Sequence, residues 1–213
     1  MDRIAIIGAG DLGRQIAYYA RRNGLEVVGF YDDYYGRALI EGCPVLGPVS
    51  QIEEDFRFGN ARWSALVCGI GYKHFAERAR LFEYFFAEKG IPFATIIDKS
   101  CLVDPTAIIG AGCVLFPASI VDKGVVLGNN VLMNVGATIA HDSRVKSHSF
   151  LSPRVAIAGF SEIGERCMCG INSTVIDNII VGDDIRLGAG TVVIDSLDEA
   201  GLYVGVPAKL KKR

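Results

Sequence analysis

Two stretches of the sequence carry residues whose types and spacing could do chemistry, and the first is a histidine followed directly by an acid. This pair is His141 and Asp142. A carboxylate beside an imidazole can orient the ring and favours its protonated form, which makes such a pair usable as a general base. The alternative interpretation is a solvated polar turn, and the spacing alone does not separate the two.

The second stretch is the glycine-rich turn Gly8-Ala9-Gly10-Asp11-Leu12-Gly13. It lies between an expected buried strand, 3–7, and an expected helix, 15–23. A second strand, 26–31, follows and ends at Asp32 and Asp33, about twenty residues beyond the turn, as in dinucleotide-binding βαβ units. Glycines at these positions let backbone N–H groups approach a phosphate at the start of a helix. Otherwise they serve only to form a tight strand-to-helix turn.

The rest of this α/β region is expected to bring a second glycine-rich turn to the same place. Residues 34–55 are loop-rich and lead into a short acidic helix. A strand at 64–68 then ends at Gly69-Ile70-Gly71, and a helix at 73–89 and a strand at 93–97 follow. The strand ends at Gly8, Asp32 and Gly71 should lie together at the carboxyl edge of a parallel sheet. The region ends near residue 98, about half the length of a full dinucleotide domain, so a mononucleotide-type ligand such as a nucleotide-sugar fits better than NAD.

A six-residue repeat fills the second half of the chain and must position the histidine. Fifteen consecutive positions at this spacing are apolar. They are Ile109, Leu115, Val121, Leu127, Met133, Ile139, Val145, Leu151, Ile157, Ile163, Cys169, Val175, Val181, Leu187 and Val193. A fixed period of this kind indicates a solenoid. Six residues fit a short strand plus a corner, with three strands closing a triangular coil and Gly or Asn at corners that need a positive φ. Fifteen consecutive matches argue against the alternative, an ordinary β-sandwich with an accidental period.

These elements predict a domain at 1–98, a solenoid at 99–198 and a C-terminal segment at 199–213. The net charge of −2 gives no electrostatic case for nucleic acid, and no apolar run approaches a membrane span of about 18 residues. Six cysteines without a C-x-x-C pair, and a start without a signal peptide, favour a cytoplasmic protein. The other two histidines are His74, in the first region, and His148, which we expect exposed at a corner. Three-histidine metal ligation therefore has too few ligands, and no metal is predicted.

The chain resembles the left-handed β-helix (hexapeptide-repeat) acyltransferases of sugars. Within them it is similar to the bacterial N-acetyltransferases of UDP-linked 4-amino-4,6-dideoxy sugars and the related sialic-acid O-acetyltransferases. The repeats carry this resemblance together with three motifs, 134–142, 170–173 and 205–209. It implies an α/β half-Rossmann domain followed by the β-helix, assembled as a homotrimer with active sites between subunits.

The resemblance also implies roles for individual residues. His141 is the expected general base, Asp142 the acid that raises its basicity, and Gly159 the donor of a backbone N–H to the thioester carbonyl. Acetyl-CoA, as co-substrate, is expected along the groove between two solenoids. The residues implied to contact it are Phe150, Gly159, Ile171 and Ala189. The residues implied to hold the nucleotide-sugar are Gly10, Asp11, Leu12, Asp32, Asp33 and Gly71. Two positions depart from the family: Asp142 replaces a Glu, and Phe150 replaces a second His.

These expectations predict direct acetyl transfer from acetyl-CoA to a sugar amine, with His141 removing the proton and a backbone N–H stabilising the oxyanion. Four alternatives stay open at this stage. They are O-acetylation of a sugar hydroxyl, an NAD-dependent oxidoreductase, a metal-dependent lyase on the same β-helix, and a non-enzymatic nucleotide-sugar-binding module.

Overall fold

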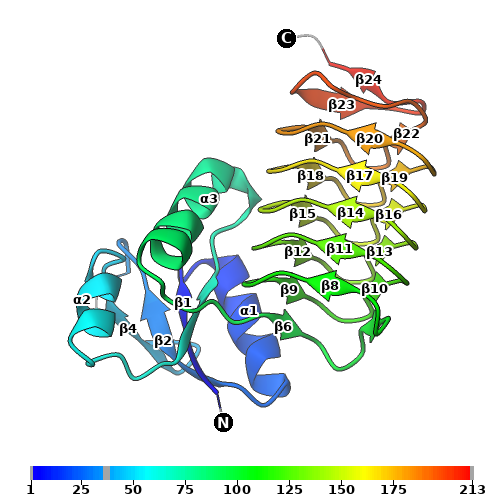
Figure 1. Ribbon diagram of the computed structural model, residues 1–213. Helices are drawn as coiled ribbons and strands as arrows, with labels where there is room; N and C mark the ends of the chain where they lie inside the picture. Colours follow the sequence, from blue (N-terminus) through cyan, green and yellow to red (C-terminus); the bar gives the residue numbers. More distant parts are fainter. Residues whose placement is uncertain (1, 36–38, 212–213) are drawn as a thin grey trace. The chain divides into compact units, whose positions relative to one another are not determined.

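The computed structural model describes residues 2–35 and 39–211 and divides into two compact units, Met1–Ile96 and Ile97–Arg213 (Figure 1). The first is an α/β unit and the second is a solenoid.

The first unit is built on a mostly parallel sheet. Its strands are β1 (Arg3–Ile7), β2 (Glu26–Tyr31), β3 (Leu39–Ile40), β4 (Cys43–Gly47) and β5 (Ala65–Cys68), in the order β3-β4-β2-β1-β5. All pairs are parallel except the edge pair β3–β4. The chain leaves β1 towards β2 on one side and later returns to place β5 on the other side. The strand order therefore reverses between β1 and β5, where open α/β sheets bind ligands beyond the carboxyl ends of their strands.

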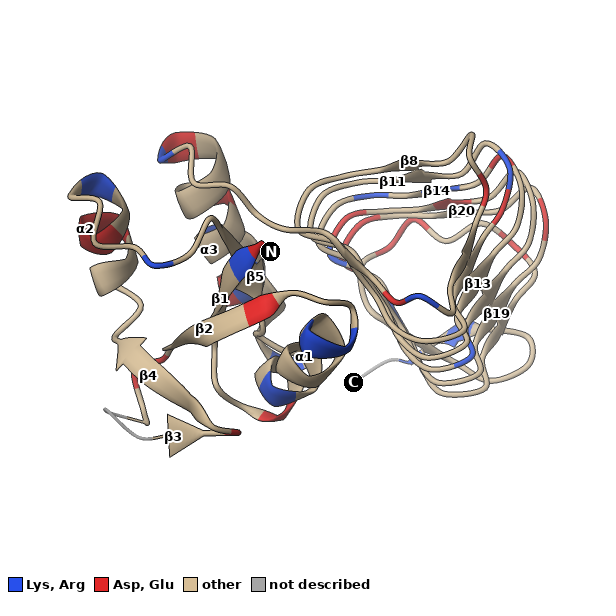
Figure 2. Ribbon diagram, turned by 90° about the horizontal axis from the view of Figure 1, so that it is seen from below, with Lys and Arg blue, Asp and Glu red and all other residues tan. Residues whose placement is uncertain are grey.

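Helices cover both faces of this sheet (Figure 2). They are α1 (Asp11–Arg22), α2 (Gln51–Arg57), the 3₁₀ turn η1 (Tyr72–His74), α3 (Phe75–Glu83) and the π-helical turn η2 (Tyr84–Glu88). The predicted helix 15–23 therefore starts earlier, at Asp11, whose charge suits the positive end of the helix dipole. The predicted helix 73–89 is a composite of three helical types.

Two predictions for this unit are wrong. The loop-rich stretch 34–55 contains β3 and β4 within its described part, and Pro44 concealed β4 because proline disfavours a central strand. Pro44 is tolerated because it faces the short edge strand β3, opposite Leu39. The predicted strand 93–97 is reduced to β6 (Ile96–Ile97), and Phe93 makes only an isolated bridge with Leu66.

The second unit is a left-handed β-helix of two-residue strands, as predicted. The strands are β7 (Leu102–Val103), β8 (Ile108–Ile109), β9 (Val114–Leu115), β10 (Ile120–Val121), β11 (Val126–Leu127), β12 (Leu132–Met133), β13 (Thr138–Ile139), β14 (Arg144–Val145), β15 (Phe150–Leu151), β16 (Ala156–Ile157), β17 (Glu162–Ile163), β18 (Met168–Cys169), β19 (Thr174–Val175), β20 (Ile180–Val181), β21 (Arg186–Leu187) and β22 (Val192–Val193). The strands β23 (Leu202–Val204) and β24 (Lys209–Leu210) follow the last coil.

Each coil contributes one strand to each of three parallel sheets. We name these faces by their central strands: the β13 face (β7, β10, β13, β16, β19, β22), the β14 face (β8, β11, β14, β17, β20) and the β15 face (β6, β9, β12, β15, β18, β21, β23, β24). Seen along its axis, the coil is triangular (Figure 2). Equivalent residues in successive coils are 18 apart, as in Ile139 and Ile157, so an edge of the prism can be read directly from the sequence.

The periodic apolar positions form the core of the prism. Fourteen of the fifteen are at most 2% exposed, and Ile109, in an early coil, packs against them partly buried. The prediction of an aliphatic core with a six-residue period is therefore confirmed. Because every coil stacks its aliphatic residue on the same residue of the next coil, burial is continuous along the axis.

The corners follow the same period, but their composition differs from the prediction. A positive φ recurs at every sixth residue from 112 to 190. Seven of these fourteen positions are Gly or Asn, and the others include Phe160 and His148. The expectation that His148 is exposed is wrong, because its side chain is only 4% exposed and its Nδ1 lies 3.1 Å from Nδ2 of Asn130 in the neighbouring coil. A left-handed residue costs about 1–2 kcal/mol, which the stacked coils offset.

Candidate active site

The paired histidine and acid lie on the prism edge between the β13 and β14 faces. Nδ1 of His141 is 3.0 Å from Oδ2 of Asp142, and both side chains are about half exposed. Asp142 is itself the corner residue, with a φ of +58°, and its carboxylate contacts the preceding ring where the chain turns from the β13 face to the β14 face. Asp142 thus reaches Nδ1 despite being one methylene shorter than Glu.

Two glycines in neighbouring coils make room for this pair. A Cβ on Gly159, one coil further along, would lie 2.8 Å from Cε1 and 2.9 Å from Nε2 of His141. A Cβ on Gly124, one coil earlier, would lie 2.7 Å from Oδ1 of Asp142. The imidazole therefore rests against one glycine and the carboxylate against the other. The other ring nitrogen, Nε2, has no hydrogen-bond partner in the described residues and is therefore available to a substrate.

The backbone N–H of Gly159 is also available. At the comparable corner positions Lys123 and Val135, the preceding Asp122 and Asn134 side chains accept the N–H at 2.7 and 2.8 Å. The residue before Gly159 is Ala158, which has no acceptor. Within the described residues the Gly159 N–H donates no hydrogen bond. A free donor adjacent to the imidazole can stabilise negative charge that develops on an oxygen during a reaction.

A phenyl ring that sequence reasoning missed completes the surroundings of the histidine. Phe160 meets His141 edge to face, with ring centroids 5.0 Å apart and an interplanar angle of 86°. It lies at the corner position one coil beyond Asp142 and is 59% exposed. Its signal was available in the sequence, because a bulky aromatic at a corner position is unusual.

The residues implied to contact CoA lie on two different edges and one face of the prism. Gly159 shares the edge of His141, between the β13 and β14 faces. Ile171 and Ala189 are exposed and lie one coil apart on the edge between the β15 and β13 faces. Phe150 is on the β15 face and is only 4% exposed, so its ring offers little surface to a ligand. The structure therefore does not gather these four residues into one site of a single chain.

In the first unit, the glycines of the two turns separate into two groups. Gly8 has a φ of +95°, and a Cβ on Gly13 would lie 2.0 Å from the Gly8 carbonyl oxygen, so the fold itself requires both. A Cβ on Gly10 or on Gly71 would meet nothing within 4 Å, and neither has a positive φ. These two glycines begin α1 and η1, at the carboxyl ends of β1 and β5. Their absent side chains leave open space where strand order reverses, which is where a phosphate could approach backbone N–H groups.

The acids after β2 brace this region. Oδ2 of Asp32 accepts the N–H of Ala9 at 2.8 Å, and Oδ1 accepts the N–H of Tyr34. Oδ1 of Asp33 accepts the N–H of Val49 at 2.8 Å. Asp32 thus ties the glycine-rich turn to the end of β2, a role that the sequence did not indicate. Asp11 and Leu12 lie in the first turn of α1.

A buried cation braces the second turn and was also missed. Arg78 of α3 is fully buried, and its Nη1 donates to the carbonyl oxygens of Cys68 and Ile70, each at 3.0 Å. No sequence pattern indicates this role, since nothing in the sequence distinguishes Arg78 from the exposed Arg80 in the same helix. The guanidinium therefore anchors the chain just before Gly71.

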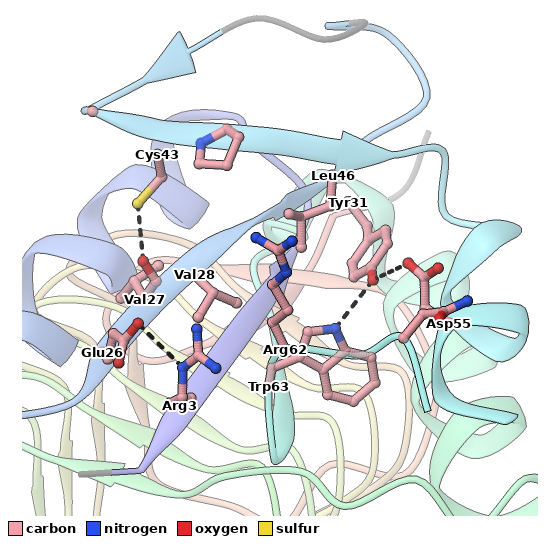
Figure 3. Close-up of a pocket in the computed structure, with 13 residues that line it drawn as sticks. Arg3, Glu26, Val27, Val28, Tyr31, Cys43, Leu46, Asp55, Arg62 and Trp63 are labelled. Atoms are coloured by element: carbon pink, nitrogen blue, oxygen red, sulfur yellow. Dashed lines mark hydrogen bonds and ion pairs between the residues drawn. The ribbon is translucent and has the colours of Figure 1, made fainter. Parts of the chain in front are cut away.

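A cavity of about 390 Å³ lies elsewhere in the first unit (Figure 3). It reaches Arg3 and Glu26 at the amino ends of β1 and β2, and no residue predicted to bind substrate lines it. At one side Tyr31 donates to Asp55 at 2.5 Å and accepts from Trp63 at 3.1 Å. Burial, followed by the hydrogen bond with Asp55, raises the pKa of Tyr31. This network holds α2 to the sheet and is structural.

Two structural features of residues 2–35 and 39–211, the described part of the chain, bear on the remaining classes of function. No group of three or more His, Cys, Asp or Glu side chains is arranged to hold a metal ion there. None of the helices in that part of the chain is long and apolar enough to cross a bilayer.

Comparison with known proteins agrees with this architecture. Residues 3–85 match the family model of the PglD N-terminal domain. The UDP-3-O-acylglucosamine N-acyltransferase of Bordetella pertussis is 35% identical over 79 residues, which is 37% of this chain and 22% of that protein. The chain thus matches about a fifth of the length of this curated relative.

Two solved structures resemble the chain over nearly its whole length. The acetyltransferase domain of PglB from Neisseria gonorrhoeae is 27% identical with a TM-score of 0.88, covering 99% of this chain and 100% of that one. PerB from Caulobacter crescentus, solved with CoA and GDP-perosamine, is 28% identical with a TM-score of 0.91, covering 100% of this chain and 98% of that one. Residues 3–85 thus match the PglD N-terminal domain, and the chain as a whole is similar to hexapeptide-repeat sugar acetyltransferases built on a left-handed β-helix.

Proposed function

We propose that the protein transfers the acetyl group of acetyl-CoA to the amino group of a nucleotide-linked 4-amino-4,6-dideoxy sugar, with UDP as the expected nucleotide, in bacterial glycan biosynthesis. The observation that carries the proposal is the arrangement at one prism edge. His141 is oriented by Asp142, rests against Gly159 and leaves Nε2 open, while the Gly159 N–H has no partner in the described residues. Solved relatives support the reaction class, since PerB holds CoA and GDP-perosamine and the PglB acetyltransferase domain holds acetyl-CoA.

The proposed mechanism is direct transfer. The neutral sugar amine attacks the thioester carbonyl while Nε2 of His141 takes a proton from the attacking nitrogen. The carbonyl oxygen gains negative charge and accepts a hydrogen bond from the Gly159 N–H. The tetrahedral intermediate then expels the CoA thiolate, which takes up the proton from the imidazolium. An amide and CoA–SH result, and no covalent enzyme intermediate is needed.

The nucleotide-sugar is proposed to bind at the first unit. Gly10 and Gly71 leave space beyond β1 and β5, and the first turn of α1, including Asp11 and Leu12, presents backbone N–H groups there. Asp32 and Asp33 keep lone pairs that can accept hydrogen bonds from the sugar or base, because each carboxylate oxygen has two. Binding both substrates in a fixed orientation would supply much of the rate.

A homotrimer with sites shared between subunits is proposed for a geometric reason. His141 and Gly159 lie on one prism edge, whereas Ile171 and Ala189 lie on another. A pantetheine arm that touches both pairs reaches them most directly if the second edge belongs to a neighbouring solenoid. This arrangement also explains why a single chain does not gather the four CoA-binding candidates.

The proposal is tested by following thiol release from acetyl-CoA with a panel of sugars. The panel contains UDP- and GDP-linked 4-amino sugars, because the expected nucleotide and the one bound by PerB differ. It also contains a free sialic acid. Release with one or more amino sugars, and not with the sialic acid, is the expected result. Release with the sialic acid alone would instead establish O-acetylation. Nucleotide-sugar binding without any release would show a non-enzymatic module.

A further inference from the structure

Phe160 occupies a position that the fold does not explain. Its φ is +56°, and its side chain is 59% exposed and lies outside the apolar core. The equivalent positions along the same edge are Gly124, Asp142 and Asn178, residue types that reach a left-handed backbone at less steric cost. A bulky residue with such a φ and without burial is a strained feature of the kind found at functional sites.

The ring contact of Phe160 points to the histidine as the reason. The imidazole of His141 is bounded by Asp142 at Nδ1, by Gly159 close to Cε1 and Nε2, and by the phenyl ring, which meets it edge to face with 5.0 Å between centroids. Nε2 is the polar atom of the ring that these neighbours leave open. A group that hydrogen-bonds to Nε2 therefore lies next to the exposed surface of the phenyl ring.

We propose that Phe160 determines acceptor specificity by forming an apolar wall beside the reacting amine. The inference rests on the proposed function. With the 4-amine at Nε2, either C3 or C5 of the sugar faces the wall, and the proposal places C5, which carries the C6 group, on that side. A methyl group that packs against the phenyl ring is stabilised by leaving water. A hydroxymethyl group placed there loses a hydrogen bond to water, and the phenyl ring offers its hydroxyl no replacement acceptor. The wall thus favours a 6-deoxy sugar over its 6-hydroxy counterpart.

The test compares kcat/KM for a nucleotide-linked 4-amino-6-deoxy sugar and for the same sugar with a 6-hydroxyl group. An apolar site discriminates against one added hydroxyl by about 10- to 100-fold, so the wild-type protein should prefer the deoxy sugar by a factor in this range. Phe160→Asn should bring the two values within about threefold of each other, and Phe160→Leu should keep most of the preference, because Leu stays apolar.

The Asn variant also separates the side chain from the backbone. Asn178 already occupies the same position one coil further along, so Phe160→Asn should fold with an unchanged or higher Tm. Ala118→Asn is the matched control: Ala118 also has a positive φ, of +60°, but lies on another edge, so this variant should gain stability in the same way and keep the wild-type preference.

Two outcomes overturn the inference while leaving the proposed function intact. One is an unchanged preference in Phe160→Asn. The other is an equal loss of kcat on both sugars in that variant, which would make Phe160 a support for the imidazole without a role in selecting the sugar. If the wild-type protein releases thiol with neither sugar nor with any other amino sugar, the proposed function fails and this inference fails with it.

Discussion

Replacing Gly159 with Ala should disable the proposed base without unfolding the protein. The added Cβ would lie 2.8 Å from Cε1, 2.9 Å from Nε2 and 3.3 Å from Nδ1 of His141. Ordinary contacts start near 3.4 Å, so the imidazole must retreat by about 0.6 Å or more, away from its present position beside Asp142. A displacement of about 1 Å can cost about 100-fold in rate, so kcat should fall by about 30- to 100-fold, or about 2–2.7 kcal/mol.

The fold should tolerate this change. Gly159 does not have a positive φ, so Ala suits its backbone. The imidazole is about half exposed and can move outward. A compatible Gly→Ala change stabilises by about 0.4–1 kcal/mol through the unfolded chain, which offsets part of the steric cost. The Tm should therefore stay within about 4 °C of the wild-type value, measured by differential scanning calorimetry.

Introducing Gly159→Ala into the His141→Ala variant shows whether the loss of rate depends on the imidazole. In His141→Ala the ring that would collide with the new Cβ is gone, so Gly159→Ala should lower the residual rate of thiol release no further. Wild-type activity in Gly159→Ala would refute the steric reasoning. An equal loss in both backgrounds would also refute it and would assign the effect to the position of the backbone N–H.

Further predictions concern the nucleotide site, the acid and the cysteines. Gly10→Ala and Gly71→Ala should keep the wild-type Tm, because the space that each new Cβ would occupy is empty, but both should raise KM for the nucleotide-sugar. Gly13→Ala is the contrasting variant: its Cβ would lie 2.0 Å from a carbonyl oxygen, so circular dichroism should show that it does not fold stably. Asp142→Asn should lower kcat by about 10- to 100-fold with little change in KM for acetyl-CoA, and unchanged kcat would remove the acid from the mechanism. Burial raises the pKa of Cys167 to about 11, so this thiol stays protonated at pH 8 in the folded protein. It should therefore react with Ellman's reagent only after unfolding, and rapid labelling of the native protein would contradict its burial.

The solenoid could be predicted because one rule decides nearly every position. Each periodic residue, such as Ile139 or Cys169, meets its own equivalent in the next coil, so the period in the sequence is the core in space. The corners were predicted less well. Their φ values follow the period, but packing against the neighbouring coil holds His148 at a corner where steric preference alone favours Gly or Asn.

The candidate site could be predicted only in part. The contact between His141 and Asp142 could be predicted because the two residues are adjacent in the sequence at a corner of the coil. The contacts of His141 with Gly159 and Phe160 join different coils, and they become visible only once the 18-residue spacing of equivalent positions is known. The buried Arg78 depends on how α3 packs on the sheet, which no local pattern encodes.

The most direct test of the central claim compares thiol release from acetyl-CoA by the wild-type protein and by His141→Ala, with nucleotide-linked 4-amino sugars as acceptors. Acetylation of the amine should be confirmed by mass spectrometry of the product. We expect thiol release that depends on an amino sugar and that falls by at least about 100-fold in the variant at neutral pH. Release that is independent of the amino sugar, or a variant as active as the wild-type protein, would contradict it.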